Sequence, residues 1–452
     1  MVNRGSFLKG TFSTRSSMLR ILVIAAALGV GMLPVQAESH ARIVRLSLVQ
    51  GSVQVDRNTG NGYEKAFLNL PLVQGTTVAT EADSRAEVEF EDGSTLRLTP
   101  KTTVEFSELT LSEDGARLST VVLKTGLVYM NYIGKQKADQ FSLAFAQEKV
   151  KLNEAAHFRV DLDENNAEVA VLKGDITVDG PAGVAELSKN KTANFILADG
   201  DKFDIAKNVE DDPNDEWDKQ QEKYHETYAK NGSYNDSPYG YGVSDMNYYG
   251  SYSNVPGYGT LWQPYFAGAA WNPFLDGAWV FYPGFGYTFV SAYPWGWMPY
   301  YYGSWVNVPG YGWGWQPGYY NGWNSIPRVT TPPNRTTTAS VGAPIPPARG
   351  TGTVLIGRGF VGGTSSRHVL VEPGSVSYGV PRGIADLNKV SREVNHNGFA
   401  TIRTTPPARP SGWYGGTPSG SSGGRMPTGG SAHVSSGGGH VSSGGAGHAP
   451  AH

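Results

Sequence analysis

The sequence predicts a mainly β protein. We expect an antiparallel β-sandwich or barrel, a short linking helix, a small domain of aromatic-rich β-hairpin repeats, and a disordered tail. Three observations lead to this prediction. Apolar and polar residues alternate from Val44 to Val178 without a long helical pattern between them. A Pro-Gly-aromatic-Gly motif then recurs at a nearly fixed spacing, and Gly, Ser and Pro dominate the last part of the chain.

Composition excludes several classes of protein. The 452 residues include 37 Lys and Arg against 40 Asp and Glu, a near balance that argues against a protein that coats nucleic acid. The chain has no cysteine, so disulfides, thiolate metal sites and cysteine nucleophiles are excluded. Gly (58) and Pro (28) are abundant while charged residues are only 17%. Such an unusual average indicates that the chain consists of segments with different compositions.

Residues 1–37 have the composition of a secretory signal peptide. Arg15 and Arg20 precede an apolar run from Ile21 to Leu33, and small residues follow up to Ala37. As a helix, that run would reach roughly 20 Å, which is short for a bilayer core of about 30 Å. We therefore expect export to the periplasm or the cell surface. We also expect cleavage after Ala37 rather than an uncleaved anchor, and no membrane span in the mature chain.

Residues 42–205 alternate with the period of short β-strands. Asp92-Gly93 lies between two alternating runs and predicts a hairpin, because tight hairpin turns need residues that tolerate positive φ angles. About ten strands at close spacing are typical of a sandwich or barrel, and about 160 residues suffice for an independent core. His157 lies in one of these strands, where we expect a hydrogen-bonded histidine at the surface.

Turn motifs follow one another in a recognisable order along this β region. They are Val49-Gln-Gly51-Ser-Val53, Leu72-Val73-Gln-Gly75, Ala86-Glu-Val88 with Asp92-Gly93-Ser94, and Leu172-Lys-Gly174-Asp-Ile176. Their order resembles the FecR periplasmic domain over residues 44–197. The resemblance implies an exported β module that binds other proteins. FecR regulators of iron uptake also have a cytoplasmic sigma-factor-binding arm. Because only 20 residues precede the apolar run here, we expect the binding role rather than sigma regulation.

An acidic linker with one helix follows over residues 208–232. Asp212 suits the cap of this helix and Pro213 its first position. One face of the helix carries three aromatic residues, Trp217, Tyr224 and Tyr228. This face either docks on its own protein or binds a partner.

Residues 246–323 contain three copies of one motif. Pro-Gly-aromatic-Gly begins at Pro256, Pro283 and Pro309, in steps of 27 and 26 residues. Aromatic residues flank each turn, which predicts one hairpin per copy and three hairpins stacked into a small sheet. The pattern from Trp295 to Trp305 resembles a Trp/Tyr/Gly-rich domain of unknown function that accompanies FecR-like modules in environmental bacteria.

The aromatic rings of this region have two interpretations. They form the core of a small domain, or some of them line a groove that stacks on the sugars of envelope glycans. The candidate residues for glycan or partner binding are Trp262, Trp279, Trp297, Trp305 and Trp315.

Residues 325–452 are rich in Pro, Gly and Ser, and we expect them to be mostly disordered. The stretch 369–394 is the part that we expect to order, with a short helix from Ile384 to Val394. Four histidines near the chain end have no spacing that defines a metal site. Residues 357–362 match a dinucleotide fingerprint, but no βαβ unit surrounds them.

These observations nominate no catalytic or metal residues, so the sequence predicts a non-enzymatic protein without cofactors. We expect an exported binding and scaffolding protein of the cell envelope. Its partner would be an envelope protein or a polysaccharide, and not nucleic acid. The alternative is an envelope signal-transduction component related to FecR-type sigma-factor regulators. The identity of the ligand and the oligomeric state stay open.

Overall fold

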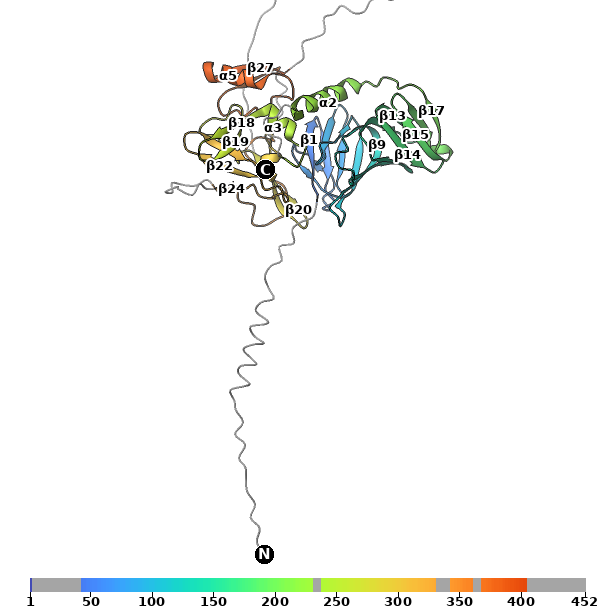
Figure 1. The fold of residues 1–452 in the computed structure, drawn as a ribbon, viewed down its shortest axis with the longest axis horizontal. Helices are drawn as coiled ribbons and strands as arrows, with labels where there is room; N and C mark the ends of the chain where they lie inside the picture. Colours follow the sequence, from blue (N-terminus) through green and yellow to red (C-terminus); the bar gives the residue numbers. More distant parts are fainter. Residues whose placement is uncertain (2–41, 231–236, 331–341, 361–366, 405–452) are drawn as a thin grey trace, which may run out of the picture. The chain divides into compact units, whose positions relative to one another are not determined.

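The structure is a computed structural model that describes residues 42–230, 237–330, 342–360 and 367–404, together with Met1. The expected signal peptide and the chain end from residue 405 onward lie outside the described residues. The protein is mainly β, with 43% strand and 12% helix, so the predicted fold class is confirmed (Figure 1). Within the described ranges, every helix is too short or too polar to cross a membrane.

Two sheets that share strand β9 form the first region, which contains the strands β1 to β17. The first sheet has the order β4 (Pro71–Leu72), β1 (Val44–Gln50), β6 (Arg85–Glu89), β7 (Thr95–Leu98), β9 (Arg117–Tyr132), β12 (Ala156–Leu162), β13 (Asn166–Lys173), β16 (Thr192–Ile196) and β17 (Lys202–Ala206).

The second sheet has the order β3 (Glu64–Lys65), β2 (Val53–Asp56), β5 (Thr77–Thr80), β8 (Thr103–Leu111), β9, β10 (Gln140–Phe145), β11 (Glu148–Leu152), β14 (Asp175–Gly180) and β15 (Gly183–Ser188). Alternate apolar residues of both sheets, such as Val88, Phe106 and Phe158, make one hydrophobic core. A 3-10 turn, η1 (Leu197–Asp199), precedes β17.

Strand β9 belongs to both sheets. Its first half pairs with β8 and β10, and its second half pairs with β7 and β12. Gly126, with φ 89°, separates the two halves, and a Cβ there would lie 2.7 Å from the Lys101 carbonyl oxygen. The alternating runs around Val121 and Leu127 are therefore one strand. The β9–β10 pair is parallel, whereas the other strand pairs of these two sheets are antiparallel as expected.

Helix α2 (Asp215–Lys230) follows the sheets and begins three residues after the predicted cap, because Asp212 to Asn214 form a turn ahead of it. Asp212 Oδ1 accepts a hydrogen bond from Asn214 N at 2.7 Å, and Asp215 Oδ2 accepts one from Asp212 N at 2.9 Å. The aromatic face of the helix docks on its own protein. Tyr224 is buried, and the ring centroids of Tyr228 and Tyr248 lie 4.9 Å apart.

The predicted hairpins form in the aromatic region, but the three do not share one sheet. The first and third copies belong to a five-stranded sheet, β18 (Gly250–Val255), β19 (Gly259–Pro264), β23 (Gly312–Gln316), β22 (Ser304–Val308) and β24 (Val329–Thr330). The middle copy belongs to a three-stranded sheet, β21 (Gly286–Ser291), β20 (Gly277–Tyr282) and β25 (Val354–Ile356). Two short helices, α3 (Val243–Tyr249) and α4 (Met298–Tyr301), precede the first and third hairpins.

The three copies share one close contact. Gly250, Gly277 and Gly303 hold the same position in the repeat. A Cβ at these positions would collide with the ring of Trp262, Phe289 and Trp315, respectively. It would also collide with the carbonyl oxygen of the residue after each ring. The repeat therefore places a glycine under an aromatic ring of the partner strand in every hairpin.

The ordered part of the C-terminal region is larger than the expected stretch 369–394. Strand β26 (His368–Val371) pairs with β27 (Ala400–Arg403), and α5 (Leu387–Asn397) lies between them in the sequence. Val371, Val376 and Leu387 are buried against the aromatic region. These few apolar residues are ordered because they pack on the aromatic side chains of residues 246–323. The average composition of residues 325–452 predicts disorder because it does not take this contact into account.

Candidate functional site

The five tryptophans predicted as glycan-binding candidates lie in the interior. Trp262, Trp279, Trp297, Trp305 and Trp315 are each at most 2% exposed. They pack against neighbouring rings, and the centroids of Trp262 and Trp295, for example, lie 5.0 Å apart. A ring without an exposed face cannot stack on a sugar. The structure therefore assigns these residues to the core of the aromatic region.

Charged side chains gather instead on the outer face of the first sheet. Along β1, β6, β7 and β12, every second residue points away from the core between the sheets. Helices α2 and α3 and the segment around Arg382 cover this face, and α3 lies beside β1 (Figure 1). We call the covered group the ionic network: Arg45, Glu87, Glu89, Arg97, His157, Asp218, Glu222, His225, Asp245 and Arg382.

Glu87 on β6 is the centre of the ionic network and has no exposed side chain. Arg97 Nε donates to its Oε2 at 2.9 Å, and Arg382 Nη1 donates to its Oε1 at 2.7 Å. His225 Nε2 lies 2.9 Å from the same Oε1. Burial raises the pKa of Glu87, but the charges of His225, Arg382 and Arg97 outweigh burial and hold the pKa well below its usual range.

Asp245 on α3 joins three parts of the chain. Its Oδ2 lies 2.6 Å from Arg45 Nη2 on β1 and 2.9 Å from Arg382 Nη2 in the C-terminal segment. The Tyr224 hydroxyl of α2 donates to Asp245 Oδ1 at 2.7 Å. Burial raises the pKa of Asp245, but Arg382 and Arg45 lower it by more, so the carboxylate stays ionised.

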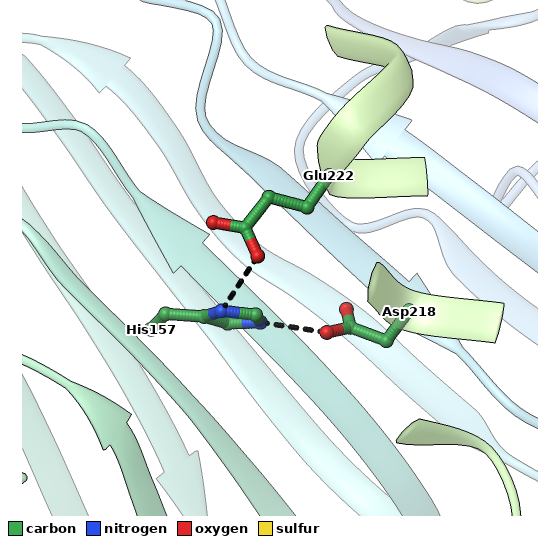
Figure 2. A group of neighbouring side chains, drawn as sticks. All are labelled: His157, Asp218 and Glu222. Carbon is green, nitrogen blue, oxygen red and sulfur yellow. Dashed lines mark ion pairs between the residues drawn. The ribbon is translucent and has the colours of Figure 1, made fainter. Parts of the chain in front are cut away.

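His157 lies between two carboxylates of α2 (Figure 2). Asp218 Oδ2 is 2.9 Å from its Nε2, and Glu222 Oε2 is 3.2 Å from its Nδ1. Burial alone would lower the pKa of His157, but the pairing with Asp218 and Glu222 raises it to about 9. The ring is therefore an imidazolium at neutral pH. It is only 4% exposed, so the expectation of a surface histidine is wrong.

The same three residues have the types and the separation of a metal-binding group, with ligand atoms within 4.8 Å of one another. However, Asp218 and Glu222 face different nitrogens of the ring. A neutral imidazole has a free lone pair on one nitrogen only, so a single metal ion bound there would not lie between the ring and both carboxylates. Arg97 Nη1 also lies 2.6 Å from Asp218 Oδ1 and adds a permanent positive charge. The geometry fits an imidazolium held by two carboxylates better than it fits a metal ion.

Sequence reasoning did not identify the ionic network, because its members are far apart in the chain. Arg382 and Glu87, for example, are 295 positions apart. One local signal was present. Asp218 and Glu222 are four residues apart and lie on one face of α2, so both carboxylates reach the same neighbour. That spacing predicts a shared cation but does not say which one.

Two regions of the chain match family models. Residues 76–177 match the FecR protein family, and residues 243–334 match a family of unknown function (DUF6600). Glu87, Arg97 and His157 lie in the first match, and Asp245 lies in the second. Comparison with curated proteins found no match.

Two solved structures of a candidate anti-sigma factor from Parabacteroides distasonis ATCC 8503 are similar to part of the chain. The sequence identities are 20% and 21%, and each TM-score is 0.25. Each similarity covers 29% of this chain and 58% of the solved chain. The chain therefore spans just over half the length of these structures.

Proposed function

We propose that this chain, which carries a FecR domain followed by a domain of unknown function, is a non-enzymatic binding and scaffolding component of the cell envelope. The observation that supports the proposal is the ionic network. Each of its carboxylates faces at least one cation within the protein. Groups neutralised in this way stabilise an arrangement of domains, whereas a catalytic group must be free to react with a substrate.

The ionic network occupies one face of the FecR sandwich, so a partner would use its other surfaces. Among the strands that the structure describes, β15 and β17 each pair with one neighbour and lie at sheet edges. Val184 on β15 is 58% exposed and Ile205 on β17 is 41% exposed. An edge strand with exposed apolar residues can accept an added strand of a partner protein. We therefore place the protein contact at these edges and a glycan contact in the aromatic region.

The second candidate function is an envelope signal-transduction component related to FecR-type regulators. The FecR match over residues 76–177 favours it. It differs from the first candidate in its partner, which would be a sigma factor or an anti-sigma factor.

A pull-down of the full-length protein from envelope extracts tests both functions. We expect the wild type to retain an envelope protein, and we expect Val184→Lys and Ile205→Lys to release it, because edge lysines block strand addition. Tyr63→Lys, at an exposed position elsewhere in the sandwich, is the matched control. Recovery of a sigma or anti-sigma factor would favour the second function. Turnover of peptidoglycan fragments by the purified protein would contradict a non-enzymatic role, and cell fractionation tests export.

A further inference from the structure

A cavity of about 300 Å³ lies in the aromatic region between residues of α2, β18 and α5. Four tyrosines line it, Tyr228, Tyr248, Tyr252 and Tyr265. Ser251, Asp386 and Asn388 are among its polar lining residues, and all three are exposed to solvent. The volume is at the lower end of the range of about 300 to 1,000 Å³ for small-molecule sites.

The aromatic walls of this cavity are held in place by the protein. The Tyr248 hydroxyl accepts a hydrogen bond from Ala385 N and donates one to Pro381 O, both at 3.3 Å. The Tyr248 ring packs on Tyr228, which is half-buried, as is Tyr265. Because these rings are already ordered, a ligand would not have to immobilise them on binding.

The charge of the cavity limits the kind of ligand. Among the described lining residues, Asp386 is the charged one, so an anionic ligand would meet a like charge. Asp386 also caps α5, where its Oδ1 accepts a hydrogen bond from Lys389 N at 3.1 Å. The helix N-terminus therefore already balances part of its charge, which weakens its attraction for a cation. A purely apolar ligand would cover the polar groups of Ser251, Asp386 and Asn388 without offering them new hydrogen bonds.

We propose that this cavity binds one or two units of a neutral saccharide. A sugar ring presents an apolar C–H face to the tyrosines and hydroxyl groups to the polar lining, so it matches both kinds of wall. The inference rests on the glycan contact of the proposed function. It places that contact at the tyrosines and not at the buried tryptophans.

Calorimetric titration of the full-length protein with chitotriose and cellotriose tests the assignment. We expect binding of at least one of these probes to the wild type and a loss of at least about tenfold in affinity for Tyr252→Ala and for Tyr265→Ala. Tyr63→Ala is the matched control, because Tyr63 is an exposed tyrosine outside the cavity, and its affinity should equal that of the wild type. Circular dichroism melting confirms that each variant is folded.

A charge variant separates a sugar from a cation. Asp386→Asn keeps a good helix cap but removes the charge, so a bound cation would lose its counter-charge in this variant. Binding of tetramethylammonium chloride that disappears in Asp386→Asn would assign the cavity to a cation and overturn the proposal. Failure of both saccharides to bind the wild type would also overturn it, while the pull-down would still decide the protein contact. Saccharide binding that survives both tyrosine variants would place the glycan elsewhere and leave the proposed function intact.

Discussion

Charged residues inside the ionic network are neutralised by one another and not solvated by water. Glu87 and Arg97 have no exposed side-chain surface, and their ion pair of 2.9 Å replaces part of their hydration. Removal of one member of a buried pair leaves the other without compensation and typically costs about 3 to 5 kcal/mol. The exposed pair of Lys202 and Asp199 lacks this dependence, and such pairs contribute about 0 to 1 kcal/mol.

The raised pKa of His157 predicts a loss of stability at alkaline pH. The pKa is about 9 in the folded chain and about 6.5 in an unfolded chain. Protonation therefore stabilises the fold fully below about pH 6.5, and this contribution is lost as the pH rises through the folded pKa. We expect the melting temperature of the wild type to fall between about pH 7 and pH 9. In His157→Gln, the melting temperature should fall less over this range, because the contribution of the imidazolium is absent.

An exposed residue without a titratable group provides the control for this prediction, since Gln136→Ala should leave the pH profile unchanged. NMR titration of the His157 ring measures the pKa directly. A midpoint near the ordinary value of about 6.5 would contradict the paired imidazolium.

At the level of the element, the hairpins of the aromatic region depend on a glycine beneath an aromatic ring. Gly250 has an extended backbone that any residue adopts, with φ −159°. A larger residue is therefore excluded at this position by the ring of Trp262 and the carbonyl oxygen of Gln263, and not by the backbone conformation. The indole Nε1 of Trp262 also donates to Met246 O at 2.9 Å, so the ring cannot move away without losing a buried hydrogen bond.

Gly250→Ala should therefore destabilise the protein by about 1 to 3 kcal/mol, because an added methyl group overfills a packed site. Urea unfolding measures this change in the free energy of unfolding. Gly352→Ala is the matched control, because nothing lies within 4 Å of a Cβ at Gly352. Equal stability of the two variants would contradict the packing argument.

At the level of the whole molecule, the ionic network connects regions that are distant in the sequence. Both matched regions and the C-terminal segment belong to one unit, Met1–Thr405. Arg382 donates to Glu87 in the FecR domain and to Asp245 in the aromatic region. Its Nη2 also donates to Ser47 O at 2.6 Å. One side chain thus holds the C-terminal segment to both domains.

Arg382→Met should loosen the C-terminal segment, because it removes the cation and leaves Glu87 and Asp245 less compensated. We expect faster hydrogen exchange at the backbone amides of residues 367–404 and a loss of about 3 to 5 kcal/mol in stability. Arg403→Met, at an exposed arginine in the same segment, should change neither quantity. Unchanged exchange in Arg382→Met would show that apolar packing alone holds the segment.

The sequence by itself determined the local features of this protein. The alternation of residues predicted the strands, and Asp92-Gly93 predicted the turn between β6 and β7. Asp212 and Pro213 predicted the helix α2, which begins at Asp215. The resemblance to FecR is confirmed over residues 76–177. These features were readable because each depends on side chains within a few positions of one another.

Only the tertiary structure decided which faces are covered. The alternating pattern predicted a surface position for His157, but α2 covers this face of the sheet and buries the ring. In the same way, the spacing of Trp262 and Trp315 did not distinguish a glycan surface from a core, and their burial did. Burial and ion pairing depend on segments that meet across hundreds of positions, and the local periodicity of a chain carries no information about such contacts.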